Sequence, residues 1–67
     1  MISIKVNDTP KQVSINSTLQ QLLDQLEVKN KGIAIAVNNN IIKKTDWNHQ
    51  TLLENDNVLI IKSTQGG

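Results

Sequence analysis

Aliphatic and polar residues alternate at the start of the chain with the two-residue period of a β-strand. The alternation covers residues 2–6 and returns at residues 13–15, and the turn-forming sequence Asn-Asp-Thr-Pro at residues 7–10 separates the two segments. A period of two is typical of a strand that buries one face. Residues 1–15 therefore predict a β-hairpin.

The period changes to that of an α-helix after this hairpin. Four leucines are spaced so that they form one stripe along a helix, namely Leu19, Leu22, Leu23 and Leu26. Two pairs before and within this stripe have the spacing of a capping box, Ser17 with Gln20 and Thr18 with Gln21. The pattern predicts a helix over residues 18–28. The segment from residue 29 to Gly32 is expected to end it, with Gly32 free to adopt a positive φ.

Three further strands are predicted in the second half of the chain. Residues 33–37 read Ile-Ala-Ile-Ala-Val, so this strand is apolar on both faces, which is typical of a strand in the centre of a sheet. An asparagine turn leads to a short strand at residues 41–42, and a turn at residues 54–57 leads to a last strand at residues 58–62. Between them, residues 43–51 are expected to be irregular, with one helical turn begun by Thr45 or Asp46.

This order of elements, strand-strand-helix-strand-strand-strand, predicts the α+β class. One amphipathic helix packed across a mixed sheet of four to five strands is the β-grasp arrangement. The 67 residues are expected to form a single β-grasp domain, residues 1–67, with a flexible C-terminal tail at residues 63–67. A domain of this size buries only about 60% of its unfolded surface, which leaves no room for a large enzyme pocket.

Composition excludes several classes of function. The chain has no cysteine, which removes disulfides, thiolate zinc sites and a cysteine nucleophile. Seven lysines and six acidic residues give a net charge of +1, without the basic stripe or stacking aromatics of a nucleic-acid binder. The longest aliphatic run, residues 58–61, is far shorter than the roughly 20 residues of a membrane span, and the N-terminus lacks the regions of a signal peptide. We therefore expect a cytoplasmic protein that binds neither nucleic acid nor membrane.

Side chains that often carry chemistry form no catalytic or metal-binding set. His49 is the one histidine and is expected to be a solvated loop residue, whereas a metal site needs three or four converging ligands. Asp24 and Glu27, three residues apart on a helix face, are expected to be solvated, as are Lys43 and Lys44, although the lysines also suit an acidic partner. Trp47, the one aromatic residue, is interpreted as a plug over one end of the core rather than as a partner-facing residue.

The end of the chain is the feature that suggests chemistry. A polar tail follows the last predicted strand and ends in Gly66 and Gly67. A terminal carboxylate is a poor electrophile, so an enzyme must activate it, for instance by joining it to the α-phosphate of ATP. Because glycine has no Cβ, a tail made of Gln65, Gly66 and Gly67 can thread a narrow channel to reach that phosphate.

With this tail, the chain resembles the ThiS family, the ubiquitin-like sulfur carriers of thiazole synthesis in the thiamine pathway. The resemblance covers essentially the whole chain. It rests on the Ile2/Ile4 opening strand, the helix start at residues 18–23, residues 35–38 followed by Ile41-Ile42, the spaced Trp47, the turn at residues 53–58 and the Gly66-Gly67 end. The chain departs from the family at Asn55, where the family often has glycine. It also departs at Lys43-Lys44, where the family often has arginine, and lysine lacks the bidentate geometry of arginine.

The resemblance implies a mechanism in which partners supply every catalytic group. A ThiF-like adenylating enzyme would use ATP and magnesium to convert the Gly67 carboxylate to an acyl-adenylate. Sulfur from cysteine, delivered by a donor such as a cysteine desulfurase system, would displace AMP and leave a thiocarboxylate on Gly67, which a thiazole synthase would consume. The chain itself would be a co-substrate rather than an enzyme, would bind no metal or cofactor, and is expected to be a monomer when free.

Strand parity predicts a docking patch for such a partner. If Val58 and Ile60 face the helix, Leu59 and Ile61 point to the opposite side of the sheet, beside the flat surface of Ala34 and Ala36. Exposed aliphatic side chains next to a reactive tail are suited to a partner. Coverage of these residues by another segment of the chain is the competing interpretation.

Three other functions are compatible with the pattern. A small-subunit-type sulfur carrier of molybdopterin synthase shares the fold and the Gly-Gly end, although that family is usually somewhat longer. A ubiquitin-like modifier would join its terminus to lysines, and a passive β-grasp interaction domain would carry out no chemistry at its terminus.

Overall fold

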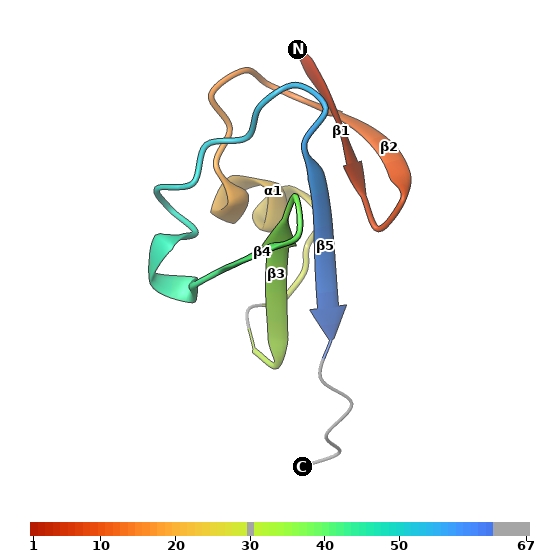
Figure 1. The fold of residues 1–67 in the computed structure, drawn as a ribbon. Helices are drawn as coiled ribbons and strands as arrows, with labels where there is room; N and C mark the ends of the chain where they lie inside the picture. The colour runs from red at the N-terminus through yellow and green to blue at the C-terminus, as the bar shows by residue number, and fades with distance from the viewer. Residues whose placement is uncertain (30, 63–67) are drawn as a thin grey trace.

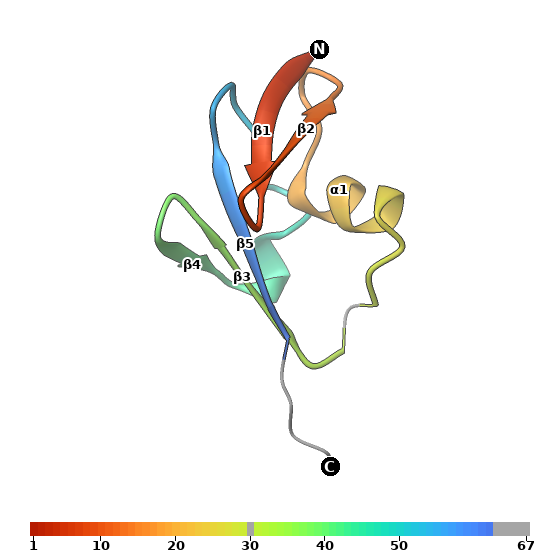
Figure 2. The same ribbon diagram turned by 90° about the vertical axis from the view of Figure 1, so that its right-hand side faces the viewer.

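Five strands form one mixed sheet, and a helix packs across one of its faces (Figures 1 and 2). The structure is a computed structural model that describes residues 1–29 and 31–62. In chain order the elements are β1 (Ile2–Val6), β2 (Thr9–Val13), α1 (Leu19–Gln25), β3 (Ile33–Val37), β4 (Asn40–Ile42), the 3-10 helix η1 (Lys44–Asp46) and β5 (Asn57–Lys62). The predicted order and the β-grasp arrangement are confirmed. The predicted tail, residues 63–67, lies outside the described residues, and the assignment of residues 1–67 to a single domain stays a prediction.

The last strand of the chain takes the middle position in the sheet. The strand order is β2-β1-β5-β3-β4, with β5 parallel to β1 and antiparallel to β3. Strand β3 has a neighbour on each side, in agreement with its two apolar faces, although β5 rather than β3 is central. The parallel pairing joins β5 to β1 at two positions only, Lys5 with Asn57 and Val6 with Val58, whereas five residues of β5 pair with β3. The C-terminal half of β5 therefore continues past β1, as Figure 1 shows.

Both hairpins turn on two residues in the left-handed region. Asn7 and Asp8 have φ values of 50° and 68°, and Asn38 and Asn39 have values of 52° and 71°. Two successive positive φ values give a turn whose twist matches that of the flanking strands, and Asn and Asp tolerate this conformation better than other non-glycine residues. Both predicted hairpin turns are therefore confirmed, but they are shorter than predicted, because Thr9 and Pro10 belong to β2 and Asn40 belongs to β4. Asn7 also supports β5, since its Oδ1 accepts a hydrogen bond from the Ile60 N–H at 2.8 Å.

The helix begins where the sequence indicated but ends earlier. Of the two candidate capping boxes, the structure uses Thr18 with Gln21: the Thr18 hydroxyl accepts from the Gln21 N–H at 3.2 Å, and the Gln21 side chain accepts from the Thr18 N–H at 2.9 Å. Helix α1 ends at Gln25 instead of near residue 28. Glu27 adopts a φ of 58°, so it does not share a helix face with Asp24, and that prediction was wrong.

A Schellman motif explains this early end. The Val28 N–H donates to the Leu23 carbonyl at 3.0 Å, and the Glu27 N–H donates to the Asp24 carbonyl at 3.2 Å, which satisfies the last helical carbonyls. Glutamate is an unusual residue for the left-handed position of this motif, so no glycine marks the helix end there. The positive φ predicted for Gly32 is present, at 68°, but Gly32 lies in the turn before β3 rather than at the helix end.

The core lies between α1 and the facing side of the sheet. It contains the three buried leucines of α1, aliphatic residues from β1, β2, β3 and β5, and two residues from the segment between η1 and β5. These core residues are Ile4, Val6, Val13, Leu19, Leu22, Leu23, Ile35, Val37, Trp47, Leu52 and Val58. Trp47 is only 2% exposed, and its Nε1–H donates to the Ile42 carbonyl at 3.0 Å, so it is a core residue as predicted. Helix η1 begins at Lys44, one residue before the predicted helical turn.

A buried carboxylate fixes the loop that leads into β5. Asp56 is 6% exposed and accepts hydrogen bonds from the Leu53 N–H at 2.8 Å and from the Asn38 side chain at 3.0 Å. The Asn55 N–H donates to the Ser3 carbonyl at 2.7 Å, and Asn55 has a φ of 70°. Asparagine therefore supplies here the left-handed conformation that glycine supplies more often. These contacts set the register in which β5 enters the sheet.

Candidate functional site

The described part of the predicted site is the end of β5. Gln65, Gly66 and Gly67, the residues expected to enter partner active sites, lie outside the described residues. The last described residue, Lys62, ends β5 at the opposite end of the sheet from the N-terminus (Figure 1), because β5 is parallel to β1. Lys62 pairs with Ile33, the first residue of β3. The chain thus leaves the sheet from its central strand.

The four residues predicted to form a docking patch lie together on the face of the sheet away from α1. Ala36 pairs with Leu59, and Ala34 pairs with Ile61, and side chains directly opposite in an antiparallel pair share a face. Leu59 is 47% exposed and Ile61 is 43% exposed, whereas Val58 is fully buried beneath the helix. The predicted parity is therefore confirmed. Docking of a partner on this patch stays a prediction.

Sequence reasoning missed one member of this surface, Ile41. It pairs with Ala36 across β3 and β4, and it is 66% exposed, while its neighbour Ile42 contributes to the core side. Two consecutive aliphatic residues in a strand must point to opposite faces, so the Ile41-Ile42 pair held the necessary signal. We call the set Ala34, Ala36, Ile41, Leu59 and Ile61 the outer patch. A shallow pocket of about 330 Å³, lined by Gly32, Ile33, Ala34 and Ile61, continues it toward the end of β5.

Other candidate side chains do not converge on this end of the molecule. His49 is exposed in the loop after η1, where its backbone N–H donates to the Asp46 carbonyl at 2.9 Å. Asp24 is exposed on α1 and accepts a hydrogen bond from the Gln20 side chain at 3.0 Å. Lys43 and Lys44 are exposed at the start of η1. Each of these residues has the solvated environment expected from the sequence.

The described residues contain neither a metal-binding cluster nor a membrane-spanning helix. Within residues 1–29 and 31–62, no group of three or more histidine, aspartate or glutamate side chains is arranged to hold a metal ion. Over the same ranges, no helix has both the length and the apolar character needed to cross a bilayer.

A solved structure supports the class of the fold. The crystal structure of the thiamine biosynthesis protein ThiS from Geobacter metallireducens matches this chain with a TM-score of 0.85 at 20% sequence identity, over 98% of this chain and 100% of the other. Identity at this level supports the fold alone. Together with the five-stranded mixed sheet and the packed helix, the match places the protein in the ubiquitin-like β-grasp class.

Sequence comparison then identifies the family. The sequence model of the ThiS family matches residues 4–67, and the match therefore includes both terminal glycines. The sulfur carrier protein ThiS of Escherichia coli (strain K12) is 29% identical over 66 residues, which cover 98% of this chain and the whole of that protein. The chain belongs to the ThiS family.

Proposed function

We propose that this protein is a sulfur carrier that supplies sulfur for the thiazole moiety of thiamine. The observation that carries the proposal is the family match, which extends through the Gly66-Gly67 end of the chain. The similarity to the Escherichia coli sulfur carrier and to a thiamine biosynthesis protein agrees with it. The sulfur would be held by the carbonyl carbon of Gly67. No cysteine of the carrier would take part, in keeping with a chain that has none.

Loading of the carrier would proceed in two steps on partner enzymes. A carboxylate oxygen of Gly67 would attack the α-phosphorus of magnesium-bound ATP on a ThiF-like enzyme, forming the acyl-adenylate and releasing pyrophosphate. A sulfur nucleophile at the oxidation level of sulfide, derived from cysteine through a donor such as a cysteine desulfurase system, would then attack the Gly67 carbonyl carbon. A C–S bond would form, AMP would leave with the electron pair of the broken C–O bond, and a thiocarboxylate would remain.

Transfer of the sulfur would complete the cycle. On a thiazole synthase, the sulfur would bond to the acceptor substrate and the C–S bond at Gly67 would break. An oxygen from that substrate or from water would take the place of the sulfur, which regenerates the Gly67 carboxylate for another round. The chain acts as a carrier and not as a catalyst, so ATP and magnesium belong to the adenylating partner. Because that partner uses ATP, we place the cycle in the cytoplasm, with the carrier monomeric between partners.

Intact mass spectrometry of the protein from its native cells tests this function. During active thiamine synthesis, we expect a fraction of the chain to gain the mass difference between oxygen and sulfur, localised to Gly67 by fragmentation. A variant that lacks Gly67, expressed under the same conditions, is the matched control and should show no such gain. Consistent absence of the thiocarboxylate would overturn the proposal, and an isopeptide-linked adduct would instead indicate a protein modifier.

The outer patch is the surface on which we propose that the adenylating enzyme docks. Leu59 and Ile61 are exposed on the central strand that leads to the tail, and Ile41 is exposed on β4. The alanines of β3, of which Ala36 is buried, leave the sheet surface flat enough for close approach. Exposed aliphatic clusters of this kind are suited to burial in an interface. A partner seated there would hold the start of the tail at a fixed position relative to its own nucleotide site.

Replacing Ile61 with aspartate tests this docking surface. We expect the dissociation constant for the adenylating enzyme to rise about tenfold or more, because a charge would have to be buried at the centre of the interface. Binding is measured by isothermal titration calorimetry, and the melting temperature is measured in parallel. Ile15→Asp is the matched control, since Ile15 is 69% exposed and lies outside the sheet. Equal affinities for Ile61→Asp and wild type, or loss of the fold, would contradict the assignment.

A further inference from the structure

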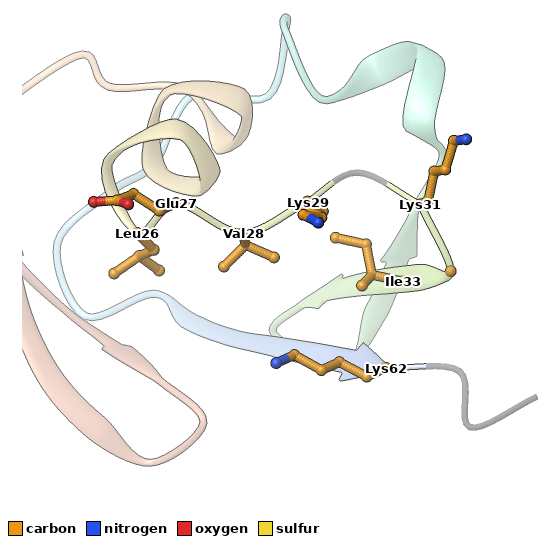
Figure 3. Close-up of a pocket in the computed structure, with 8 residues that line it drawn as sticks. Leu26, Glu27, Val28, Lys29, Lys31, Ile33 and Lys62 are labelled. Atoms are coloured by element: carbon orange, nitrogen blue, oxygen red, sulfur yellow. The ribbon is translucent and has the colours of Figure 1, made fainter. Parts of the chain in front are cut away.

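A pocket lies beside the end of β5 on the helix side of the sheet (Figure 3). Its volume is about 430 Å³, and its walls come from the segment after α1, the start of β3 and the last residue of β5. The lining residues are Leu26, Glu27, Val28, Lys29, Lys31, Gly32, Ile33 and Lys62. We call it the lysine pocket. Neither the outer patch nor the chemistry at Gly67 accounts for it.

The floor of the lysine pocket is aliphatic. Leu26, Val28 and Ile33 point into the space between the segment after α1 and β5, as Figure 3 shows, and all three are half-buried. The Schellman motif produces this arrangement, because the left-handed residue Glu27 turns the chain toward the sheet while Val28 stays bonded to the helix end. A half-buried aliphatic floor leaves apolar surface available for an apolar side chain of another molecule.

The rim of the lysine pocket is positively charged. Lys29 and Lys62 flank the floor from the two opposing walls, and Lys31 stands at the edge and points away from the floor (Figure 3). All three lysines are exposed, and Glu27 is the one acidic residue in the lining. Three of the seven lysines of a chain with a net charge of only +1 thus gather at one pocket. Such a concentration favours an anionic occupant.

The lysine pocket and the outer patch lie on opposite faces of the same strand end. Lys62 pairs with Ile33 on the helix side, whereas Ile61 pairs with Ala34 on the outer side. Any enzyme that receives the tail must approach this end of β5. A segment of that enzyme reaching around the strand end would meet the lysine pocket directly.

We propose that the lysine pocket receives an acidic segment of the adenylating enzyme, with an aliphatic side chain of that segment on the floor and its carboxylates beside Lys29 and Lys62. The inference rests on the proposed function, since it takes its partner from it. A protein segment matches both the apolar floor and the charged rim. A small inorganic anion would leave the floor unused. The enzyme would then hold the end of β5 from both faces, which fixes the direction in which the tail departs.

Charge reversal at the pocket, with a reversal elsewhere as control, tests the proposal. The pocket variant carries Lys29→Glu and Lys62→Glu, and the control variant carries Lys11→Glu on β2 and Lys44→Glu on η1. All four lysines are exposed, and each double reversal changes the net charge from +1 to −3, since each substitution subtracts two. Affinity for the adenylating enzyme is measured by calorimetry at low and at high salt, with sedimentation of the carrier alone and ATP–pyrophosphate exchange alongside.

We expect the pocket variant to bind at least tenfold more weakly at low salt, with the control variant within about threefold of wild type. High salt should weaken the binding of wild type strongly and that of the pocket variant little, because the attraction that salt screens is already lost in the variant.

Equal effects of the two double reversals, or no effect of the pocket variant, would overturn the proposal. Self-association of the carrier that the pocket variant abolishes would also overturn it and assign the pocket to a second copy. If wild type supports no exchange with the enzyme, the proposed function itself fails. If wild type is active and the pocket variant binds equally well, only the lysine pocket assignment fails.

Discussion

Replacing Gly66 with valine is expected to lower the rate of adenylation of the C-terminus about 100-fold or more while leaving the fold intact. The proposed chemistry requires the Gly67 carboxylate to approach the α-phosphate of ATP in line with the departing pyrophosphate. A misplacement of about 1 Å at such a centre is enough to cost about 100-fold in rate. A branched side chain on the residue before the reacting group adds bulk where the tail must pass along the channel wall.

The measurement is ATP–pyrophosphate exchange with saturating carrier, together with the melting temperature of the variant. Thr64→Val is the matched control, because it places valine in the same tail without increasing the bulk of the residue, and it should support nearly full exchange. The affinity of Gly66→Val for the enzyme should stay within a few-fold of wild type if docking relies on the folded surface. Exchange at the wild-type rate by Gly66→Val would show that the channel argument is wrong.

Replacing Trp47 with alanine is expected to unfold the domain. Trp47 is 2% exposed and is among the largest fully buried side chains of the molecule. Truncation of a buried aromatic residue to alanine costs about 3–5 kcal/mol, which includes the cavity that it leaves. A single core of this size supplies no more than about 3–5 kcal/mol of net stability. The truncation therefore removes most or all of the stability of the native state.

Trp47→Phe separates the two contributions of this side chain. It keeps an aromatic ring in the core but removes the hydrogen bond from Nε1–H to the Ile42 carbonyl. Loss of that bond at a part-buried carbonyl should cost about 1–3 kcal/mol. Urea denaturation followed by far-ultraviolet circular dichroism is suitable for all three proteins, since neither variant retains a tryptophan for fluorescence. A cooperative transition of Trp47→Ala at a midpoint near that of wild type would contradict the central role of Trp47 in the core.

The regular elements were predictable because local periodicity and turn chemistry determine them. Residues 2–6 alternate strictly, and the two pairs of asparagine or aspartate turn residues have the conformational tolerance that two-residue hairpins require. The helix end was not predictable in this way. It depends on Glu27 taking a left-handed conformation that the bonds of Val28 and Glu27 to the helix carbonyls stabilise, and glutamate carries no local signal for that conformation.

The candidate site was predictable to the extent that strand parity governs it. Successive side chains of a strand point to opposite faces, so Leu59 and Ile61 could be placed on the outer face without knowledge of the sheet order. The lysine pocket was not accessible to the same reasoning, because its walls come from segments more than thirty residues apart in the sequence, with Lys29 on one wall and Lys62 on the other. The two walls face each other because Lys62 pairs with Ile33, and a pairing register between distant strands has no signature in either strand alone.

The position of β5 has a mechanical consequence for a protein that is held by its end. A pull on Lys62 along the strand axis acts in the plane of the sheet and at right angles to the hydrogen bonds that join β5 to β3. All five paired positions then bear the load together in shear. A tail attached to β2 or β4, at an edge, would let the load peel the strand away one bond at a time. Attachment to the central strand thus allows an enzyme to grip and release the tail repeatedly without unravelling the domain that carries it.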